Sequence, residues 1–174
     1  CYEIGGDYYD FIRRDDGKIL VALGDVSGKG TAAALLMSSL HAAIHAQVAS
    51  NRELAGTVAS INEYLAENTP ANRFVTLFIA ELDPDGGSLE FINAGHNPPL
   101  IGRADGRIEQ LESGGLPLGL MAAAQYETGN AQLGRGDVLF IYSDGVSEAN
   151  DVQEEEFGMD RLRQVIRHNV QRSA

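Results

Sequence analysis

The sequence contains one cysteine among 174 residues and few basic residues, and each scarcity excludes a class of protein. A single cysteine cannot form an internal disulfide, which favours a reducing compartment and leads us to expect a cytoplasmic location. Lys and Arg together number 13 against 25 Asp and Glu, so the net charge is −12, and no basic run stands out. This balance argues against nucleic acid or an anionic membrane as the main partner.

Long apolar runs are also absent. No stretch approaches the roughly 18 consecutive apolar residues of a transmembrane helix, and no signal peptide is visible. A hydrophobic content of 44% over 174 residues is enough for one domain with a sizeable core, which we place at residues 1–174. Position 1 is Cys rather than Met, so we expect this domain to be a piece of a longer polypeptide.

Three common catalytic motifs are missing or incomplete. Neither a Cys-x5-Arg loop nor a Gly-x-Ser-x-Gly elbow occurs, which argues against cysteine-phosphatase and serine-hydrolase chemistry. The segment from Gly24 to Thr31 superficially matches a phosphate-binding loop, but its glycines enclose three residues where that motif needs four. Asp25 within such a loop would also repel a phosphate. A metal ligand at the end of a strand is the better interpretation of Asp25.

The sequence does contain aspartates at positions where charge is costly. Asp25 ends the apolar run 19–24, Asp144 ends the run 138–143, and Asp7 follows a Gly-Gly pair. Such runs predict strands buried on both faces, so each carboxylate is held near the core. If they converge, two charges about 4 Å apart repel by about 4 kcal/mol at an effective dielectric constant of about 20. Divalent cations relieve that repulsion, and oxygen ligands are those that Mg²⁺ and Mn²⁺ prefer.

The hydrophobic pattern predicts an order of strands, helices, strands and a last helix. We expect strands over 2–14 and 18–25, helices over 31–49 and 51–68, hairpin-linked strands over 74–143, and a helix from Phe157 onward. This order differs from the strand–helix alternation of a doubly wound parallel sheet. It predicts an α+β fold in which a mainly antiparallel sheet is covered by helices.

Three histidines and a further aspartate each allow two interpretations. His96 and Asn97 lie in a Gly- and Pro-rich turn, so we favour hydrogen bonds to the backbone over a general-acid role for His96. His41 and His45 are four residues apart on a predicted helix, a spacing that can bind a metal, but their Ala-rich surroundings favour packing or an interface. Asp10 lies on the first strand and either supports a metal site from behind or is a solvated charge.

Five motifs in a fixed order resemble one protein family. They are Gly5-Gly6-Asp7-Tyr8-Tyr9-Asp10, Gly24-Asp25-Val26-Ser27-Gly28-Lys29-Gly30, Ala94-Gly95-His96-Asn97-Pro98-Pro99, Leu116-Pro117-Leu118-Gly119 and Tyr142-Ser143-Asp144-Gly145-Val146-Ser147-Glu148. They span essentially the whole chain, which resembles the bacterial PP2C-type serine/threonine phosphatases of the SpoIIE/RsbU class. This resemblance implies an antiparallel β-sandwich flanked by helices on both outer faces.

The resemblance also implies a set of site residues. Asp7, Asp25 and Asp144 match the acidic metal ligands, and the carbonyl of Val26 matches a backbone ligand. Two Mn²⁺ or Mg²⁺ ions are implied, holding a water that attacks phosphoserine or phosphothreonine in line. Residues that we expect to support these ligands from behind are Asp10, Ser27, Gly145, His96 and Asn97.

Partners and one alternative follow from the same resemblance. It implies a phosphorylated anti-sigma-factor antagonist of the STAS type as substrate, an upstream sensor domain in the parent chain, and a regulatory or homodimer surface on residues 31–68. Such phosphatases usually carry another acidic ligand near a final strand. This chain lacks that pattern, so we expect its last strand to be missing. The alternative is a catalytically weak phosphatase-like module that sequesters a signalling partner.

Overall fold

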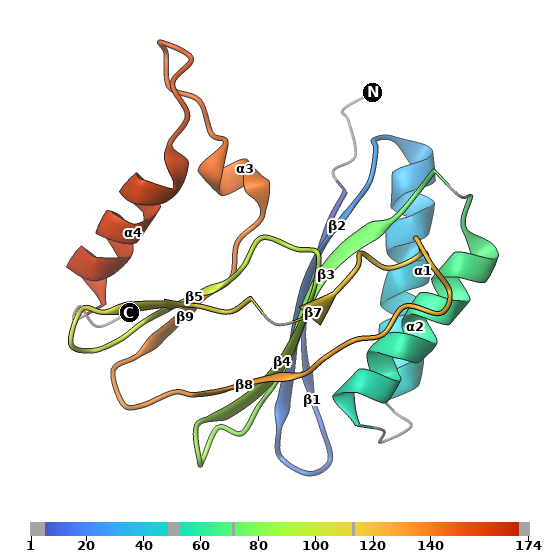
Figure 1. The fold of residues 1–174 in the computed structure, drawn as a ribbon, viewed down its shortest axis with the longest axis horizontal. Coiled ribbons are helices and arrows are strands. Elements are labelled where there is room, and N and C mark those ends of the chain that lie inside the picture. The colour runs from blue at the N-terminus through green and yellow to red at the C-terminus, as the bar shows by residue number, and fades with distance from the viewer. Residues whose placement is uncertain (1–5, 49–52, 71, 113, 171–174) are drawn as a thin grey trace.

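The structure, a computed structural model, describes residues 6–48, 53–70, 72–112 and 114–170 (Figure 1). A six-stranded sheet contains β1 (Asp7–Arg13), β2 (Ile19–Val26), β3 (Val75–Leu82), β4 (Ser88–Ala94), β7 (Gly114–Gly115) and β8 (Gly129–Gln132). A three-stranded sheet has β5 (Leu100–Gly102) between β6 (Ile108–Gln110) and β9 (Val138–Phe140). The helices are α1 (Thr31–Val48), α2 (Leu54–Asn68), α3 (Asp144–Ser147) and α4 (Gly158–Asn169).

These elements stack in four layers, which confirms the expected α+β sandwich. The helices α1 and α2 cover one face of the larger sheet, the smaller sheet packs toward its other face, and α4 lies outside the smaller sheet (Figure 1). Strand alternation explains the two faces, because Leu20, Ala22 and Val26 of β2 pack beneath the helices. The alternate residues Val21, Leu23 and Asp25 point the other way. The named strands pair antiparallel, as expected, except for the parallel pair β4–β7.

The two long helices pack on the sheet through apolar stripes. The buried apolar residues repeat about every four positions, which places them on one side of each helix. They are Leu36, Leu40 and Ile44 in α1, and Leu54, Val58, Ile61 and Leu65 in α2. Residues 49–52, where we expected the second helix to begin, lie outside the described residues. Within the described ranges, no helix is both long and apolar enough to cross a bilayer.

The run before Asp144 differs from the expectation of a strand buried on both faces. Only Val138–Phe140 pairs as β9, and Val138 is 41% exposed. Among the described strands β9 lies at an edge of the smaller sheet, so one side of its backbone has no neighbouring strand there. The chain then leaves the ladder over residues 141–143 and enters α3, which the sequence did not predict. Asp144 is therefore the first residue of a short helix and does not end a strand.

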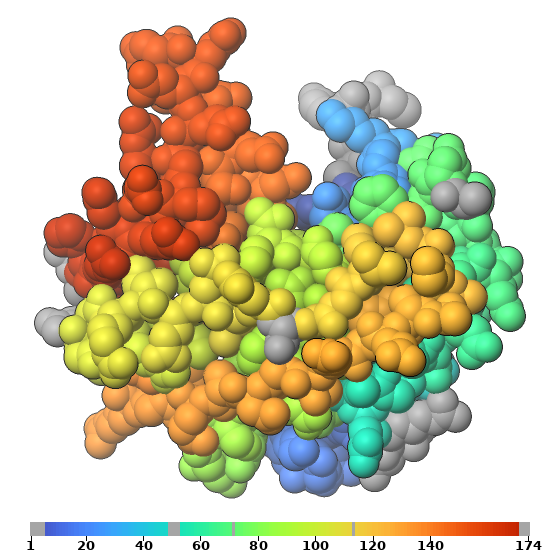
Figure 2. Space-filling view, in the orientation of Figure 1, coloured from blue at the N-terminus to red at the C-terminus, as the bar shows by residue number. Residues whose placement is uncertain are grey.

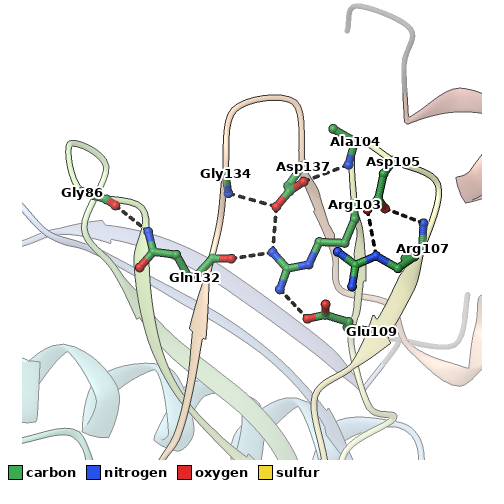
Figure 3. Close-up of polar contacts among 9 residues, drawn as sticks. All are labelled: Gly86, Arg103, Ala104, Asp105, Arg107, Glu109, Gln132, Gly134 and Asp137. Atoms are coloured by element: carbon green, nitrogen blue, oxygen red, sulfur yellow. Dashed lines mark hydrogen bonds and ion pairs between the residues drawn. The ribbon is translucent and has the colours of Figure 1, made fainter.

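A network of charged groups holds the β8–β9 turn against the β5–β6 hairpin (Figure 3). The Asp137 carboxylate accepts hydrogen bonds from the backbone N–H groups of Gly134 and Ala104, both at 2.9 Å, and from Arg103 at 2.7 Å. Arg103 also donates to Glu109 and to the Gln132 carbonyl. The two backbone N–H groups and Arg103 lower the pKa of Asp137 to about 2. The chain thus enters β9, and then α3, from a fixed turn.

Candidate functional site

Pairing of the first two strands brings two of the predicted aspartates together. Asp7 of β1 lies directly opposite Asp25 of β2 in the antiparallel ladder. Directly paired residues project from the same face of a sheet. That face is the one turned away from α1 and α2, because the neighbouring Val26 points into the helix-covered core. Two carboxylates therefore stand side by side at the end of the larger sheet.

The third predicted aspartate reaches this pair from the far end of the sequence. Ser143, next to Asp144, donates its hydroxyl to Oδ2 of Asp7 at 3.1 Å. Burial, followed by the negative charges of Asp7 and Asp144, raises the pKa of Asp25 above its ordinary value. A charge effect of this kind requires Asp144 to lie near Asp25. The structure thus brings the three predicted aspartates to one region.

The three carboxylates do not meet at a single point. Their oxygens do not all come within 4.8 Å of one another. In Figure 2 the surface is hollowed between the orange segment of α3 and the light blue start of α1, and dark blue atoms of the first strands lie at the base. Ligands of two ions about 3.5–4 Å apart must spread more widely than those of a single ion. The spacing is therefore compatible with two ions.

Gly6 leaves room beside two of these oxygens. A Cβ atom at this position would lie 2.8 Å from the carbonyl oxygen of Val26 and 3.0 Å from Oδ1 of Asp25. The Val26 N–H donates to the Gly6 carbonyl at 3.2 Å, which fixes this close approach. The Val26 carbonyl and the Asp25 carboxylate therefore face a space that only glycine leaves free. Carboxylate and carbonyl oxygens form a donor set that suits Mg²⁺ or Mn²⁺.

His96 connects the Asp144 segment to the larger sheet. Its ring lies between the Thr76 hydroxyl, 3.1 Å from Nδ1, and the Tyr142 carbonyl, 3.1 Å from Nε2. A carbonyl only accepts, so Nε2 carries the proton and Nδ1 accepts from Thr76. Burial lowers the pKa of His96, against the opposing effects of the Tyr142 carbonyl and of Asp7 and Asp144. This geometry fits the backbone-bonding role that we favoured over a general acid.

The loop after Asp25 is tied to the start of β3. The Ser27 hydroxyl accepts from the Phe74 N–H at 2.9 Å, and the Ser27 carbonyl accepts from Arg73 Nη1 at 2.6 Å. Gly28 has φ +92°, and a Cβ there would lie 1.8 Å from Arg73 Nη1. Glycine at this position therefore lets the guanidinium lie directly on the loop. Ser27 holds the loop in place instead of pointing its hydroxyl freely into the hollow.

The remaining expected supporting residues have different outcomes. Asp10 does not support the aspartate pair, because it is three residues from Asp7 and so lies on the opposite, helix-covered face, beside His45. Gly145 is exposed in α3, and Asn97 is half-buried. The amide that shapes the His96 turn is that of Asn93, whose Oδ1 accepts the His96 N–H at 2.7 Å.

The contacts of several residues of this region were not predicted from the sequence. These residues are Gly6, Arg73, Thr76, Tyr142 and Ser143. Arg73 and Thr76 had a usable signal, because an antiparallel neighbour of β2 must begin where β2 ends. The contacts of Ser143 and Tyr142 had no usable signal in the sequence. Ser143 contacts Asp7 across more than 100 residues, and Tyr142 contributes only its backbone carbonyl.

Comparison with known proteins places this arrangement in context. Residues 15–174 match the family described as Stage II sporulation protein E (SpoIIE). The phosphoserine phosphatase RsbU of Bacillus subtilis (strain 168) is 32% identical over 147 residues, covering 84% of this chain and 44% of that protein. The chain spans less than half the length of the curated relatives it matches.

Solved structures agree with the fold. The RsbU and RsbW domains of Rv1364c from Mycobacterium tuberculosis are 28% identical with a TM-score of 0.74, covering 83% of this chain and 41% of that one. The SiaA-PP2C domain of Pseudomonas aeruginosa has a TM-score of 0.82 at 20% identity, covering 97% of this chain and 68% of that one. The second likeness concerns the fold alone.

Proposed function

Since this chain belongs to the SpoIIE family of PP2C-type phosphatases, we propose that it removes phosphate from a phosphoserine or phosphothreonine protein with the help of bound divalent cations. One observation carries the proposal: Asp7 pairs directly with Asp25, beside a glycine that leaves their surroundings open. Two acidic groups side by side, with a third nearby, are costly unless cations are present. Such a cost indicates a functional site rather than a stabilising one.

The oxygens that would hold the cations come from separate parts of the chain. They are the carboxylates of Asp7, Asp25 and Asp144 and the carbonyl of Val26. Mn²⁺ or Mg²⁺ suits this donor set, and two ions are proposed. When bound, such a pair makes a water nucleophilic near neutral pH and neutralises phosphoryl oxygens.

The chain itself supplies the positioning. Ser143 orients Asp7 through its 3.1 Å hydrogen bond, and His96 anchors the carbonyl that precedes Ser143. Arg73 fixes the loop that follows Asp25, which holds the Val26 carbonyl in place. The cysteine of this chain has no role in the proposal, because attack by water requires no phosphoenzyme. These contacts would hold the ligand oxygens in place before substrate arrives.

The proposal extends to the substrate and to a surface on the two long helices. RsbU is named a phosphoserine phosphatase, and RsbU and RsbW domains occur together in Rv1364c. We therefore propose a phosphorylated STAS-type anti-sigma-factor antagonist as substrate, and an upstream sensor domain in the parent chain. A groove of about 270 Å³ between α1 and α2 is lined by Leu35, which is 66% exposed, and by Arg73. A homodimer or sensor contact on residues 31–68 would therefore reach the Ser27 loop through Arg73.

Hydrolysis of a phosphoserine peptide tests the proposal. It is measured as release of inorganic phosphate, with and without Mn²⁺. We expect Mn²⁺-dependent turnover, with a loss of at least about a hundredfold in Asp25→Asn and in Asp144→Asn because each removes a charged ligand. Asp85→Asn is the matched control, since Asp85 is an exposed turn residue of the β3–β4 hairpin. Its turnover should equal that of the wild type.

Two results would contradict the proposal. Turnover equal to that of the wild type in both Asp25→Asn and Asp144→Asn would exclude these aspartates from the chemistry. Tight binding of a phosphorylated partner without any turnover by the wild type would instead favour the phosphatase-like binding module. A longer chain that carries a further acidic ligand distinguishes such a binding module from a phosphatase that only lacks its second ion. Turnover would return in the longer chain in the second case and not in the first.

A further inference from the structure

A second group of potential metal ligands lies on the opposite face of the larger sheet from the aspartates. Oδ2 of Asp10, on β1, is 2.7 Å from Nε2 of His45 and 4.0 Å from Nε2 of His41. The two histidines are one turn apart on α1, and their ring centroids are 4.4 Å apart. Among the described residues, this is the group of at least three His, Cys, Asp or Glu side chains whose ligand atoms all lie within 4.8 Å.

We propose that Asp10, His41 and His45 form a binding site for Zn²⁺, separate from the aspartate site. Two imidazole nitrogens and one carboxylate oxygen are the ligand types that Zn²⁺ takes, whereas Mg²⁺ and Mn²⁺ prefer oxygen alone. Three protein ligands leave a fourth tetrahedral position for water or for a group from a partner. This chemistry differs from that of the all-oxygen aspartate site, so the two sites should prefer different metals.

The observed distances are close to those that zinc requires. With metal–ligand bonds of about 2.0–2.2 Å, neighbouring ligands of a tetrahedral ion lie about 3.3–3.6 Å apart. The distances of 2.7 and 4.0 Å from Asp10 to the two rings fall on either side of that range. Both rings can adjust, because the side chains of His41 and His45 are 57% and 45% exposed. Shifts of less than about 1 Å would close the site.

The Asp10 carboxylate is already held in position for this role. The Tyr8 hydroxyl donates to its Oδ2 at 3.0 Å, and the Phe11 N–H donates to its Oδ1 at 2.7 Å. Burial acts to raise the pKa of Asp10, but hydrogen bonds from His45, Tyr8 and Phe11 outweigh it and lower the pKa. Outer contacts of this kind orient a ligand and strengthen metal binding.

A simple His–Asp hydrogen bond accounts for only part of this arrangement. It explains the 2.7 Å contact of His45, but it gives no reason for His41 to present Nε2 to the same oxygen. A bound ion would use both rings. It would also link α1 to β1, the strand that carries Asp7, so zinc binding would stabilise the helix against the sheet.

Calorimetric titration with Zn²⁺ tests the site independently of phosphatase activity. The protein would carry Asp25→Asn and Asp144→Asn, so that the other site contributes little. We expect one Zn²⁺ per chain and a rise in melting temperature. His41→Ala and His45→Gln should each weaken binding at least about tenfold, since even outer contacts of a metal site are worth about 10–100-fold. His45→Gln keeps a hydrogen-bond donor near Asp10, and therefore separates loss of a ligand from loss of the hydrogen bond.

His168→Ala is the matched control, because His168 is an exposed histidine on α4 whose Nδ1 bonds its own helix at Gln164. It should bind Zn²⁺ as tightly as the parent. Visible absorption of Co²⁺ in place of Zn²⁺, with intensity typical of a tetrahedral site, would support the proposed geometry. Unchanged zinc affinity in both His41→Ala and His45→Gln, or an equal loss in His168→Ala, would overturn the proposal.

Discussion

Replacing Gly6 with alanine adds one methyl group at the centre of the candidate site. Gly6 does not have the positive φ that would make a side chain unfavourable by itself. The added Cβ would lie 2.8 Å from the Val26 carbonyl oxygen and 3.0 Å from Oδ1 of Asp25. Both oxygens are proposed metal ligands. The substitution therefore tests the ligand geometry without removing any ligand.

The size of the effect follows from the overlap. A carbon and an oxygen normally approach no closer than about 3.2 Å, so both contacts require the backbone or the carboxylate to move by a few tenths of an ångström. Inserting a methylene into a packed region costs about 1–3 kcal/mol. If the metal-free site opens to relieve this strain, the same energy opposes closure around the ions. At about 1.4 kcal/mol per factor of ten, metal affinity falls by about 5- to 150-fold.

The assay is phosphate release from a phosphoserine peptide as a function of Mn²⁺ concentration. Gly6→Ala should need about 5- to 150-fold more Mn²⁺ for half-maximal rate. Gly56→Ala is the control, because a Cβ at Gly56 in α2 meets nothing within 4 Å. That control should keep the wild-type Mn²⁺ requirement and gain up to about 1 kcal/mol of helix stability. A wild-type Mn²⁺ requirement in Gly6→Ala would refute the assignment of these oxygens as ligands.

Three further predictions concern stability. Asp137 has a pKa of about 2 in the folded protein, so it adds stability above its unfolded pKa of about 3.9, and this stability is lost as the pH falls toward 2. The melting temperatures of the wild type and of Asp137→Asn should therefore converge between about pH 4 and pH 2. A difference in melting temperature that stays constant over this range would contradict the prediction. The pKa of Asp25 is raised by burial and by Asp7 and Asp144, so its charge destabilises the metal-free fold at neutral pH. Asp25→Asn should melt higher than wild type without metal and gain less from Mn²⁺, whereas a lower melting temperature would disprove the repulsion. His96→Ala should lower the free energy of unfolding, measured in urea, by about 2 kcal/mol or more, because it leaves the buried Tyr142 carbonyl without its hydrogen-bond donor. A loss below about 0.5 kcal/mol would show that His96 does not position the Tyr142 carbonyl.

Much of the fold could be predicted because it depends on local patterns. The apolar stripe of Leu36, Leu40 and Ile44 predicted α1, and the apolar run 19–24 predicted β2. Which residues of β2 face α1 came only from the structure, because a run buried on both faces has no alternation to show it. The end of the Asp144 run was less predictable. Whether an apolar run pairs as a strand depends on its neighbours in the sheet, and β9 lies at an edge of the described sheet.

The candidate site shows the same division. Asp7 and Asp25 could be identified from their places beside glycines and apolar strands, and the register of β1 and β2 then put them opposite each other. Asp10 was misplaced because distance along a strand was considered without its face, although the two-residue period puts it on the helix side. The contact of Ser143 with Asp7 joins residues 136 positions apart, and only the assembled fold determines it. Asp10, the third ligand of the proposed zinc site, also meets His41 and His45 only in the assembled fold, so the sequence did not predict it.

Crystals of the protein grown with Mn²⁺ and measured at the manganese absorption edge test the central claim most directly. We expect anomalous peaks within about 2.0–2.3 Å of the Asp7 and Asp25 carboxylates, with the Val26 carbonyl oxygen at the same distance from one of them. Manganese bound elsewhere, with Asp7 and Asp25 turned apart or neutralised by basic side chains, would contradict the account.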